Sequence, residues 1–488
     1  MSSISALPYD ILQRILDDLD DSSTMATYCL LSRDINGPAS SKLYNRLRVN
    51  FMGSRGTIER VSSMLRAASL PLNCHRVKTV ILRGVPSDGL VPLEQHLVLL
   101  ALQEFNCLEN FTVQTEGQLD TYWTDDASIL SLFAHLSRIT SLRSLTIDPL
   151  PCIPHIGNVL TLFDHNSLRE LCLVDRFENP LHSIPVDFSL SLTRLQVRVR
   201  DYWMLDVMPT LPSVRKFRNL KSLTLGFANL NNSHEMLESL ALLPHLEDLC
   251  LEFSNGLEAF GIPLSERPIF PNETGLATSL QLPPPRNLKS FTLRHKDPYH
   301  RETIIDAPRL CKLIKHIISL SSIEELSFQR PFSYTRTLNP NPKQSWDILI
   351  DHLADKHAKS LRYLDLEAGF VRKTAMEILL RKCNRLEELI VATSPGSLMT
   401  LIRNSSTVPR LVRACFEFRT HKREGWSSRR LSRSFSLYEA TDIMRATRLR
   451  RLTINDDKWV ASWVRDGDGA LEYCLEEVGV DTHMYGGN

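Results

Sequence analysis

The sequence predicts an α/β fold in which strands and helices alternate along a solenoid, and three observations support this prediction. First, the 488 residues are several times the size of a usual domain, which indicates either several domains or a repeat array. Second, a short pattern, apolar-x-x-apolar-x-apolar, recurs along most of the chain. Third, segments with helical periodicity separate these recurrences. Together they favour an array in which each strand is followed by a helix.

The recurring pattern marks the strands of this array. It begins at thirteen apolar positions: Val77, Leu108, Leu142, Leu168, Leu192, Leu220, Leu246, Leu288, Ile323, Leu361, Leu386, Leu411 and Leu449. The spacing is uneven, but several successive intervals are similar, such as the 24 residues from Leu168 to Leu192 and the 28 from Leu192 to Leu220. This spacing is typical of a leucine-rich repeat. The asparagine that usually closes each turn is mostly missing, so the repeats are degenerate.

Helical periodicity predicts the second half of each repeat. It covers residues 95–105, 129–139, 236–243, 310–320, 346–358, 375–383 and 438–446. Strand and helix form a right-handed coil that buries its core by stacking on neighbours, which favours a horseshoe. The polar residues that alternate with the leucines should line its concave sheet, and they include Arg194, Gln196, Asp248, Glu252, Tyr363, Asp365 and Glu367. The alternative is a doubly wound sheet of unrelated βα units.

A small helical module precedes the repeats. Pro8 suits the first turn of a helix, and Asp10 lies where the helix dipole favours a negative charge. One apolar stripe follows, made of Ile11, Leu12, Ile15, Leu16 and Leu19. Carboxylates within residues 17–21 should end this helix. Two further helices are predicted, one ending near residue 31 and one over residues 37–47.

These opening residues resemble the F-box, the helical module that docks a substrate receptor onto the Skp adaptor of a cullin-RING ubiquitin ligase. The resemblance rests on Leu7-Pro8, the pairs Ile11/Leu12 and Ile15/Leu16, Leu19, the run Cys29-Leu30-Leu31-Ser32-Arg33, Leu43-Tyr44 and Leu47-Arg48-Val49. Asp10 stands where the family usually has Glu, and Ile35 lies near the position of a usual Trp. The resemblance implies an adaptor surface made of Leu7, Pro8, Ile11, Leu12, Ile15, Leu16, Leu19 and Leu30. The alternative is a three-helix cap that packs on its own domain.

Four long segments predict a second binding surface. Residues 253–286, 294–306, 329–345 and 418–436 each follow a strand pattern, so in a parallel solenoid they should leave the sheet at one rim. They contain aromatic residues with arginines and histidines, which is the composition of interface hot spots. The predicted target-binding residues are Arg330, Phe332, Tyr334 and Arg336 on the rim, with Tyr363, Asp365 and Glu367 on the concave sheet. Surface insertions without function are the alternative.

Composition argues against several other classes of protein. The formal net charge is +1 with mixed signs, so a nucleic-acid partner is not expected. No apolar run is long enough to span a bilayer and the start does not resemble a signal peptide, so we expect no membrane partner and a cytoplasmic or nuclear location. The ten cysteines are scattered without a C-x-x-C pair, so neither disulfides nor zinc is expected.

No catalytic motif is recognisable, so the sequence predicts a protein that is not an enzyme and needs no cofactor. The expected domains are the F-box at 1–50, a helical linker at 51–74 and a degenerate leucine-rich solenoid with a C-terminal cap at 75–488. The resemblance implies the substrate-recognition subunit of an SCF-type (Skp-cullin-F-box) ubiquitin ligase, with the Skp adaptor, cullin and an unidentified target protein as partners. The alternative is a leucine-rich scaffold or GTPase regulator outside any ligase.

Overall fold

The computed structural model describes most of the repeat region and part of the opening helices. The described residues are 11, 16, 22–31, 33–51, 56–85, 92–115, 126–148, 159–164, 167–175, 184–185, 188, 190–199, 214, 216–227, 233–253, 281–295, 307–329, 346–420, 429–430, 436–455, 457–465 and 471–477. The chain divides into two compact units, Met1–Arg200 and Asp201–Asn488, named unit 1 and unit 2 below.

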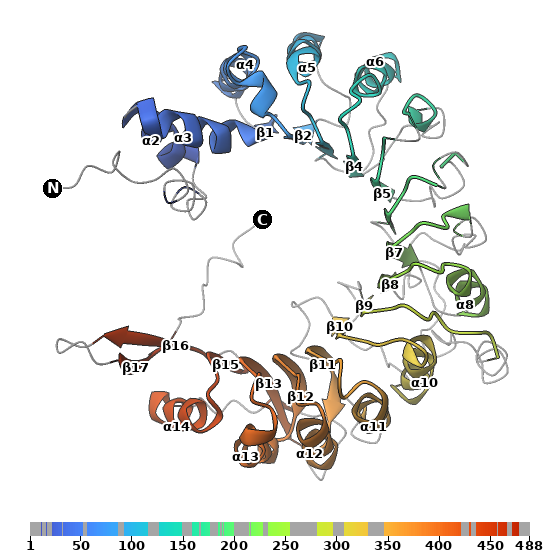
Figure 1. Cartoon of the computed structure of the whole chain (residues 1–488), viewed down its shortest axis with the longest axis vertical. Coiled ribbons are helices and arrows are strands. Elements are labelled where there is room, and N and C mark those ends of the chain that lie inside the picture. The colour runs from blue at the N-terminus through green and yellow to red at the C-terminus, as the bar shows by residue number, and fades with distance from the viewer. Residues whose placement is uncertain are drawn as a thin grey trace. The chain divides into compact units, whose positions relative to one another are not determined.

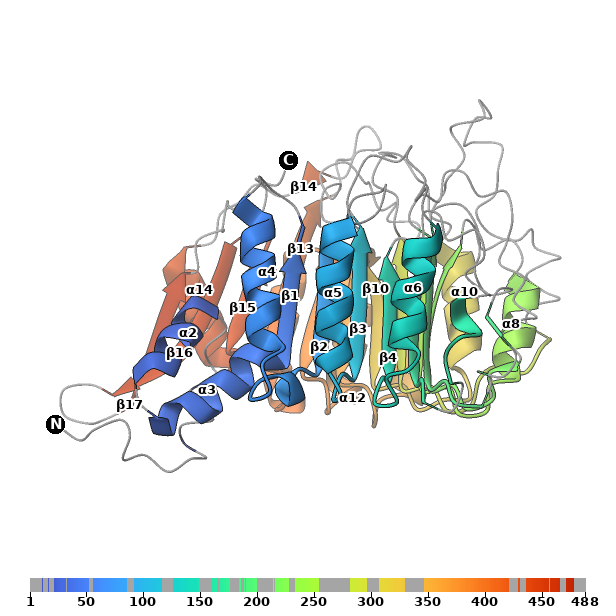
Figure 2. The ribbon, with the colours of Figure 1, turned by 90° about the horizontal axis from the view of Figure 1, so that it is seen from above.

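In its described part, unit 1 has helices α2 and α3, followed by strands with helices between the first of them (Figure 1). In chain order its elements are α2 (Ser22–Leu31), α3 (Arg33–Asn45), β1 (Arg46–Asn50), α4 (Gly56–Ala68), η2 (Cys74–Arg76), β2 (Thr79–Val85), α5 (Pro92–Glu104), β3 (Asn110–Thr115), α6 (Asp126–Leu136), β4 (Ser144–Asp148), β5 (Glu170–Asp175) and β6 (Arg194–Val199). Each strand pairs in parallel with the next. Figure 2 shows α4, α5 and α6 side by side on one side of these strands.

Unit 2 repeats this arrangement and ends differently. Its elements are β7 (Ser222–Phe227), α8 (Ser233–Ala241), β8 (Asp248–Phe253), β9 (Ser290–His295), α10 (Ala307–Ile318), β10 (Glu325–Gln329), α11 (Asp347–Lys356), β11 (Tyr363–Val371), α12 (Lys373–Lys382), β12 (Glu388–Thr393), α13 (Gly396–Arg403), η11 (Ser405–Thr407), β13 (Arg413–Thr420), β14 (Arg429–Arg430), α14 (Leu437–Thr447), β15 (Arg451–Ile454), β16 (Asp457–Arg465) and β17 (Leu471–Glu477). Strands β7 to β13 and β15 pair in parallel. The last strands, β15 to β17, are antiparallel.

The predicted strand pattern is confirmed at all thirteen positions. Each of these apolar residues lies two positions before a strand, and none is more than 3 % exposed. Within a strand the apolar side chains alternate with polar ones: in β4, Leu145 and Ile147 are buried, whereas Ser144, Thr146 and Asp148 are partly exposed. The predicted helices coincide with α5, α6, α8, α10, α11, α12 and α14. The sheet of each unit is therefore parallel-dominated, as the sequence predicts for a solenoid-like α/β fold.

Two boundaries differ from the sequence prediction. The third opening helix ends at Asn45, and residues 46–50, which the prediction places in the helical module, form strand β1 of the sheet. The reason is local: Leu47 and Val49 are buried and alternate with exposed neighbours, which is the period of a strand. At the other end, the predicted cap contains the antiparallel hairpin of β16 and β17. The linker predicted at 51–74 does contain a helix, α4.

Backbone hydrogen bonds tie successive repeats together where each strand begins. One carbonyl accepts two N–H groups from the next repeat: the Glu324 oxygen accepts from Arg362 at 2.7 Å and from Tyr363 at 3.0 Å. Serine hydroxyls just before the strand patterns add to these contacts. The Ser360 hydroxyl donates to the Ile323 carbonyl at 2.7 Å, and the Ser141 hydroxyl donates to the Leu108 carbonyl at 2.8 Å. These carbonyls therefore have hydrogen-bond partners in the turn that precedes the next strand.

Candidate binding surfaces

The opening helices enclose a small core of their own. Leu16, Met25, Ile35 and Ala39 are at most 3 % exposed and form one cluster, against which Tyr28, Cys29 and Leu43 pack. A hydrogen bond joins α3 to α2, since the Asn36 amide donates to the Cys29 carbonyl at 2.7 Å, and within α3 the Ser40 hydroxyl donates to Asn36 Oδ1 at 3.2 Å. The Lys42 ammonium donates to the Leu16 carbonyl. These side chains make the module a packed body ahead of the repeats.

The predicted adaptor residues divide into exposed and buried ones. Leu30 on α2 is 87 % exposed and Ile11 is 41 % exposed, so both lie on the surface of the described module. Leu16 is 1 % exposed and packs inside the cluster, so its side chain supports the module from within. Ile35, at the position usually held by Trp, is also inside. The remaining predicted contacts lie outside the described residues: Leu7, Pro8, Leu12, Ile15 and Leu19.

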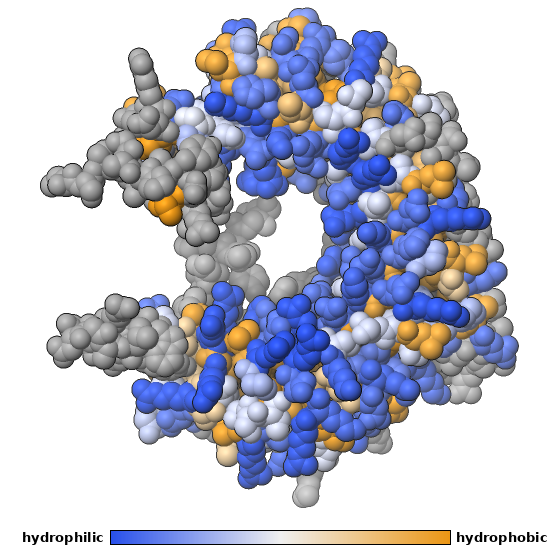
Figure 3. Space-filling view, viewed as in Figure 1, coloured by the Kyte–Doolittle hydropathy of each residue, from blue (hydrophilic) through white to orange (hydrophobic). Residues whose placement is uncertain are grey.

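Each sheet has an apolar face, which packs against the helices, and a polar face. The polar face consists of the side chains that alternate with the buried apolar ones along each strand. In Figure 3, hydrophilic residues gather on the strand side of each unit, and hydrophobic ones appear among the helices. In unit 2, strand register places Glu252 of β8 beside Arg294 of β9, and Arg294 beside Gln329 of β10. Three neighbouring strands thus contribute one polar residue each to a single row.

This row is an ion pair between a fully buried carboxylate and a partly exposed guanidinium, completed by an amide. Glu252 is fully buried, and Arg294 Nη1 donates to its Oε1 at 2.7 Å. The other side of the same guanidinium, through Nε and Nη2, donates twice to Gln329 Oε1 at 3.1 Å. A buried carboxylate is tolerated only when paired and hydrogen-bonded, and the planar fork of arginine meets both neighbours at once. The residues therefore hold one another in place across three strands.

A second polar group lies one strand further along. Asp365 of β11 is 5 % exposed, and its Oδ2 accepts from the Ser327 hydroxyl at 3.1 Å and from the Tyr363 hydroxyl at 3.4 Å. Burial raises the pKa of Tyr363 far above its usual range, and the neighbouring Asp365 and Glu388 carboxylates add to the effect. The phenol is therefore protonated and donates. Asp365 and Tyr363 are engaged within the fold, while the Glu367 side chain lies outside the described residues.

The rim residues predicted to bind a target, Arg330, Phe332, Tyr334 and Arg336, also lie outside the described residues. The strands before the four long segments are described: β8, β9, β10 and β13 belong to the parallel part of unit 2. Parallel strands bring their carboxyl ends to one edge of a sheet, so the four segments start at the same edge. The predicted convergence of their side chains stays a prediction.

The polar face of unit 1 has a different character. Arg46 and Arg48 of β1 and Arg83 of β2 are exposed and share this face. On the far strands, Arg194 Nη1 lies 3.5 Å from Glu170 Oε1, and about half of the Arg194 side chain is exposed. Asn110 donates through Nδ2 to Thr79 Oγ1 at 3.3 Å. The polar face of unit 1 thus carries small polar residues and exposed arginines, whereas that of unit 2 carries the row of Glu252, Arg294 and Gln329.

The sequence contained a signal for Arg83 and Arg294 that the apolar repeat pattern did not use. The residue directly after each strand pattern forms a column across repeats, which reads Arg83, Gln114 and Asp148 in unit 1, and Glu252, Arg294 and Gln329 in unit 2. Only Glu252 of these was predicted to line the sheet. Opposite charges in adjacent repeats of the column indicate the pair in unit 2, since register makes them neighbours. Arg46 and Arg48 were missed because residues 46–50 were placed in the helical module and not in the sheet.

The described residues offer no constellation for metal chemistry. No group of three or more His, Cys, Asp or Glu side chains among them is arranged to hold a metal ion. The cysteines described, such as buried Cys311 and Cys383 and exposed Cys107, are free thiols. Burial raises the pKa of the Cys383 thiol to about 12, which makes it a poor nucleophile. The helices described are too short or too polar to cross a bilayer.

Comparison with known protein families and with curated sequences gives no match. No model of a known protein family matches the chain, and no curated protein sequence is similar to it. A function therefore has to be argued from the residues: a helical module with an exposed leucine, and two sheets whose polar faces differ.

Proposed function

We propose that the chain is the substrate-recognition subunit of an SCF-type (Skp-cullin-F-box) ubiquitin ligase. The observation that carries the proposal is the helical module with its own core, which precedes the leucine-rich strands and exposes Leu30. A leucine that is 87 % exposed beside a packed core is available to a partner, and it falls within the run that resembles the F-box. The module would bind the Skp adaptor and, through it, cullin.

In this proposal the repeats hold the target protein. A leucine-rich solenoid presents one continuous sheet face, and segments that start at one edge can add further contacts. The chain itself would perform no chemistry. Binding would raise the local concentration of target lysines near a ligase-bound conjugating enzyme, and the rate would increase through proximity alone.

The alternative function is a leucine-rich scaffold or GTPase regulator in which the helices only cap the array. One observation favours it: α3 runs directly into β1, and the Lys78 N–H donates to the Asn45 carbonyl at 3.1 Å. The module is therefore continuous with the first strands of unit 1, as the cap of a repeat array would be. The packing is compatible with both functions, so only a measurement of partner binding can distinguish them.

Copurification with the adaptor distinguishes the two functions. We expect the full-length chain to copurify with the Skp adaptor and cullin when they are expressed together. Leu30→Asp should weaken adaptor binding by at least roughly tenfold, because a charge replaces an apolar anchor. Leu72→Asp is the matched control, because Leu72 is 76 % exposed in the same unit but lies outside the module. Absence of the adaptor from wild-type preparations, or equal loss in both variants, would contradict the proposal.

A further inference from the structure

The strands β1 and β2 present three arginines on one patch of the polar face of unit 1. Arg46 and Arg48 alternate with buried residues along β1, so both side chains leave the same face. Register pairs Arg46 with Thr79, Arg48 with Ile81 and Asn50 with Arg83, which puts Arg83 on that face, diagonal to Arg48. Side chains on one face repeat about every 7 Å along a strand and about 5 Å between strands. Arg48 therefore neighbours both Arg46 on its own strand and Arg83 on the next, and the three residues, named the arginine patch, form one group on this face.

The arginine patch lacks a carboxylate partner among the described residues. No ion pair in the described part of the chain includes Arg46, Arg48 or Arg83, and all three side chains are exposed. The described acidic residues of this polar face are Asp148 on β4 and Glu170 on β5, at least two strands beyond β2, or about 10 Å away. Like charges this close repel one another, and an anionic partner would relieve the repulsion.

The surroundings of the patch suit a protein segment better than a nucleic acid. Single-stranded nucleic acids need aromatic platforms for their bases as well as positive charge. The neighbouring positions of this face on β2 and β3 carry no aromatic ring: Thr79, Asn110, Thr112 and Gln114 offer hydrogen-bonding groups, and Ile81 is aliphatic. The chain also has no large excess of positive charge, since its net charge is +1. Carboxylates match the arginine fork bidentately.

We propose that the arginine patch binds an acidic segment of a partner protein, through carboxylates that pair with Arg46, Arg48 and Arg83. The patch lies on β1, directly after α3, so the segment is held close to the module. Calling this segment part of a ubiquitination target rests on the proposed function; the binding itself does not.

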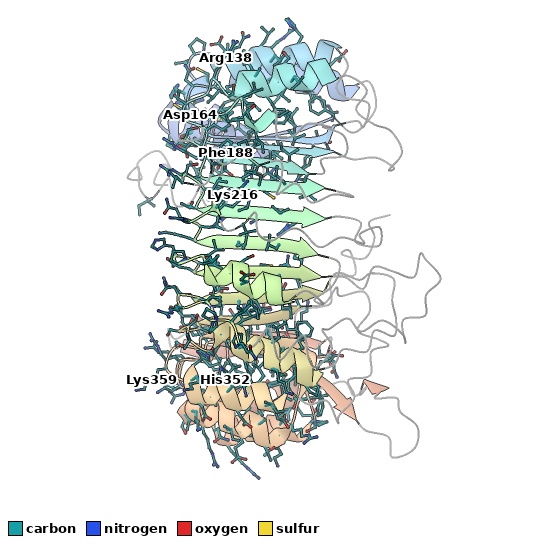
Figure 4. All side chains as sticks on the ribbon, turned by 90° about the vertical axis from the view of Figure 1, so that its right-hand side faces the viewer. Arg138, Asp164, Phe188, Lys216, His352 and Lys359 are labelled. Atoms are coloured by element: carbon teal, nitrogen blue, oxygen red, sulfur yellow. The ribbon has the colours of Figure 1, made fainter. Side chains whose placement is uncertain are left out.

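The test uses the full-length chain and labelled decaglutamate as the probe, measured by fluorescence anisotropy at low and at physiological ionic strength. The variant is Arg46→Glu with Arg48→Glu and Arg83→Glu. Its matched control is Arg60→Glu with Arg66→Glu and Arg138→Glu, which makes the same change in net charge at exposed arginines. Arg60 and Arg66 lie on α4, and Arg138 follows α6 at the edge where the strands begin (Figure 4).

We expect the wild-type chain to bind decaglutamate, with affinity that falls as salt rises. The patch variant should bind at least roughly tenfold more weakly, whereas the control should stay within about twofold of wild type. Circular dichroism melts should show that both variants are folded. If charge reversal unfolds the chain, the milder Arg46→Gln, Arg48→Gln and Arg83→Gln variant must show the same loss.

Three results would overturn the proposal. Equal weakening in the patch variant and its control would show that net charge, not the patch, attracts the peptide. Tighter binding of an oligouridine of equal length would identify a nucleic-acid surface, and equal binding of decalysine would show that charge sign does not matter. Adaptor copurification is measured separately. If the wild-type chain copurifies with the adaptor but does not bind decaglutamate, this inference fails and the proposed function stands.

Discussion

Unit 1 and unit 2 share one repeating apolar pattern and differ in what their polar faces do. In unit 2 the fully buried Glu252 is fixed by Arg294, and Asp365 accepts two hydroxyl donors. In unit 1 the corresponding face exposes Arg46, Arg48 and Arg83. The apolar positions thus determine the fold in both units, while the polar positions are free to serve packing in one and binding in the other.

The largest effects should come from the apolar face, and they should be equal in both units. Leu145 of β4 and Leu223 of β7 are both fully buried. Leu145→Asp and Leu223→Asp should each lower the free energy of unfolding by at least about 4 kcal/mol, because an unpaired charge enters the core. Circular dichroism melts check this, with Ser144→Asp and Ser222→Asp as controls on the other face. Wild-type melting of either leucine variant would mean that the strand register is wrong.

Substitutions on the polar face should separate the units. Arg294→Ala in unit 2 leaves the fully buried Glu252 without its guanidinium partner and should cost about 3 kcal/mol. Arg194→Ala in unit 1 removes an exposed pair with Glu170 and should cost less than about 1 kcal/mol. Urea unfolding midpoints of the two variants measure the difference. Similar midpoints would show that the two polar faces are energetically alike.

Acid should destabilise unit 2 through a buried histidine. His357 is 1 % exposed, its Nδ1 accepts from the Ile323 N–H at 3.4 Å, and burial with the nearby His352 and Lys356 lowers its pKa to about 4. The folded state favours the neutral ring, so the stability that His357 contributes is complete above pH 6.5 and is lost as pH falls towards 4. Between pH 7 and pH 5 the loss should be roughly 2 kcal/mol.

His357→Asn keeps an acceptor for the Ile323 N–H but cannot be protonated, so its urea midpoint should depend less on pH in this window. The pKa of His352, whose ring lies edge-on to that of His357 with centroids 5.4 Å apart, is also lowered and should leave a residual slope. The carboxyl groups of Glu387 and Asp355 have lowered pKa values, so the stability that their ionised forms add to the fold is lost only below about pH 4.5. An identical pH slope in wild type and variant would rule out His357 as the cause.

The smallest effects should distinguish two glycines. A Cβ on Gly369 would lie 2.7 Å from the ring of Trp346, which stacks on Phe328 at 4.9 Å between ring centroids. Gly369→Ala should therefore cost about 1–2 kcal/mol by overpacking. Gly37 in α3 has open space around it, so Gly37→Ala should stabilise the opening helices by about 0.5–1 kcal/mol. Melting temperatures give both signs, and a destabilised Gly37→Ala would mean that the packing of α3 is wrong.

The apolar period predicted much of the fold because burial leaves little freedom at those positions. The first apolar residue of each strand pattern, from Val77 to Leu449, lies two residues before an observed strand. β1 was missed because its five residues follow a helix without a turn, and the hairpin of β16 and β17 was missed because its antiparallel pairing breaks the repeat. Local pattern does not reveal a change in strand direction.

The polar sites were harder to predict because charge alone does not say which side chains are buried. Asp365 was predicted to bind the target and Glu252 to line the concave sheet, yet each is at most 5 % exposed and is held by neighbouring strands. Their partners, Ser327 and Arg294, come from the preceding or following repeat about 40 residues away, so only register brings them together. Exposure of Leu30 likewise depends on how α2 packs on α3.

The most direct test of the account is whether the module and the arginine patch bind different partners at the same time. Purified Skp adaptor would be titrated into the full-length chain by calorimetry, without and then with saturating decaglutamate. We predict a one-to-one complex whose affinity changes by less than about twofold when the peptide is present, because separate sites give no coupling. Absence of heat and of a complex with the wild-type chain, without peptide, would contradict the account.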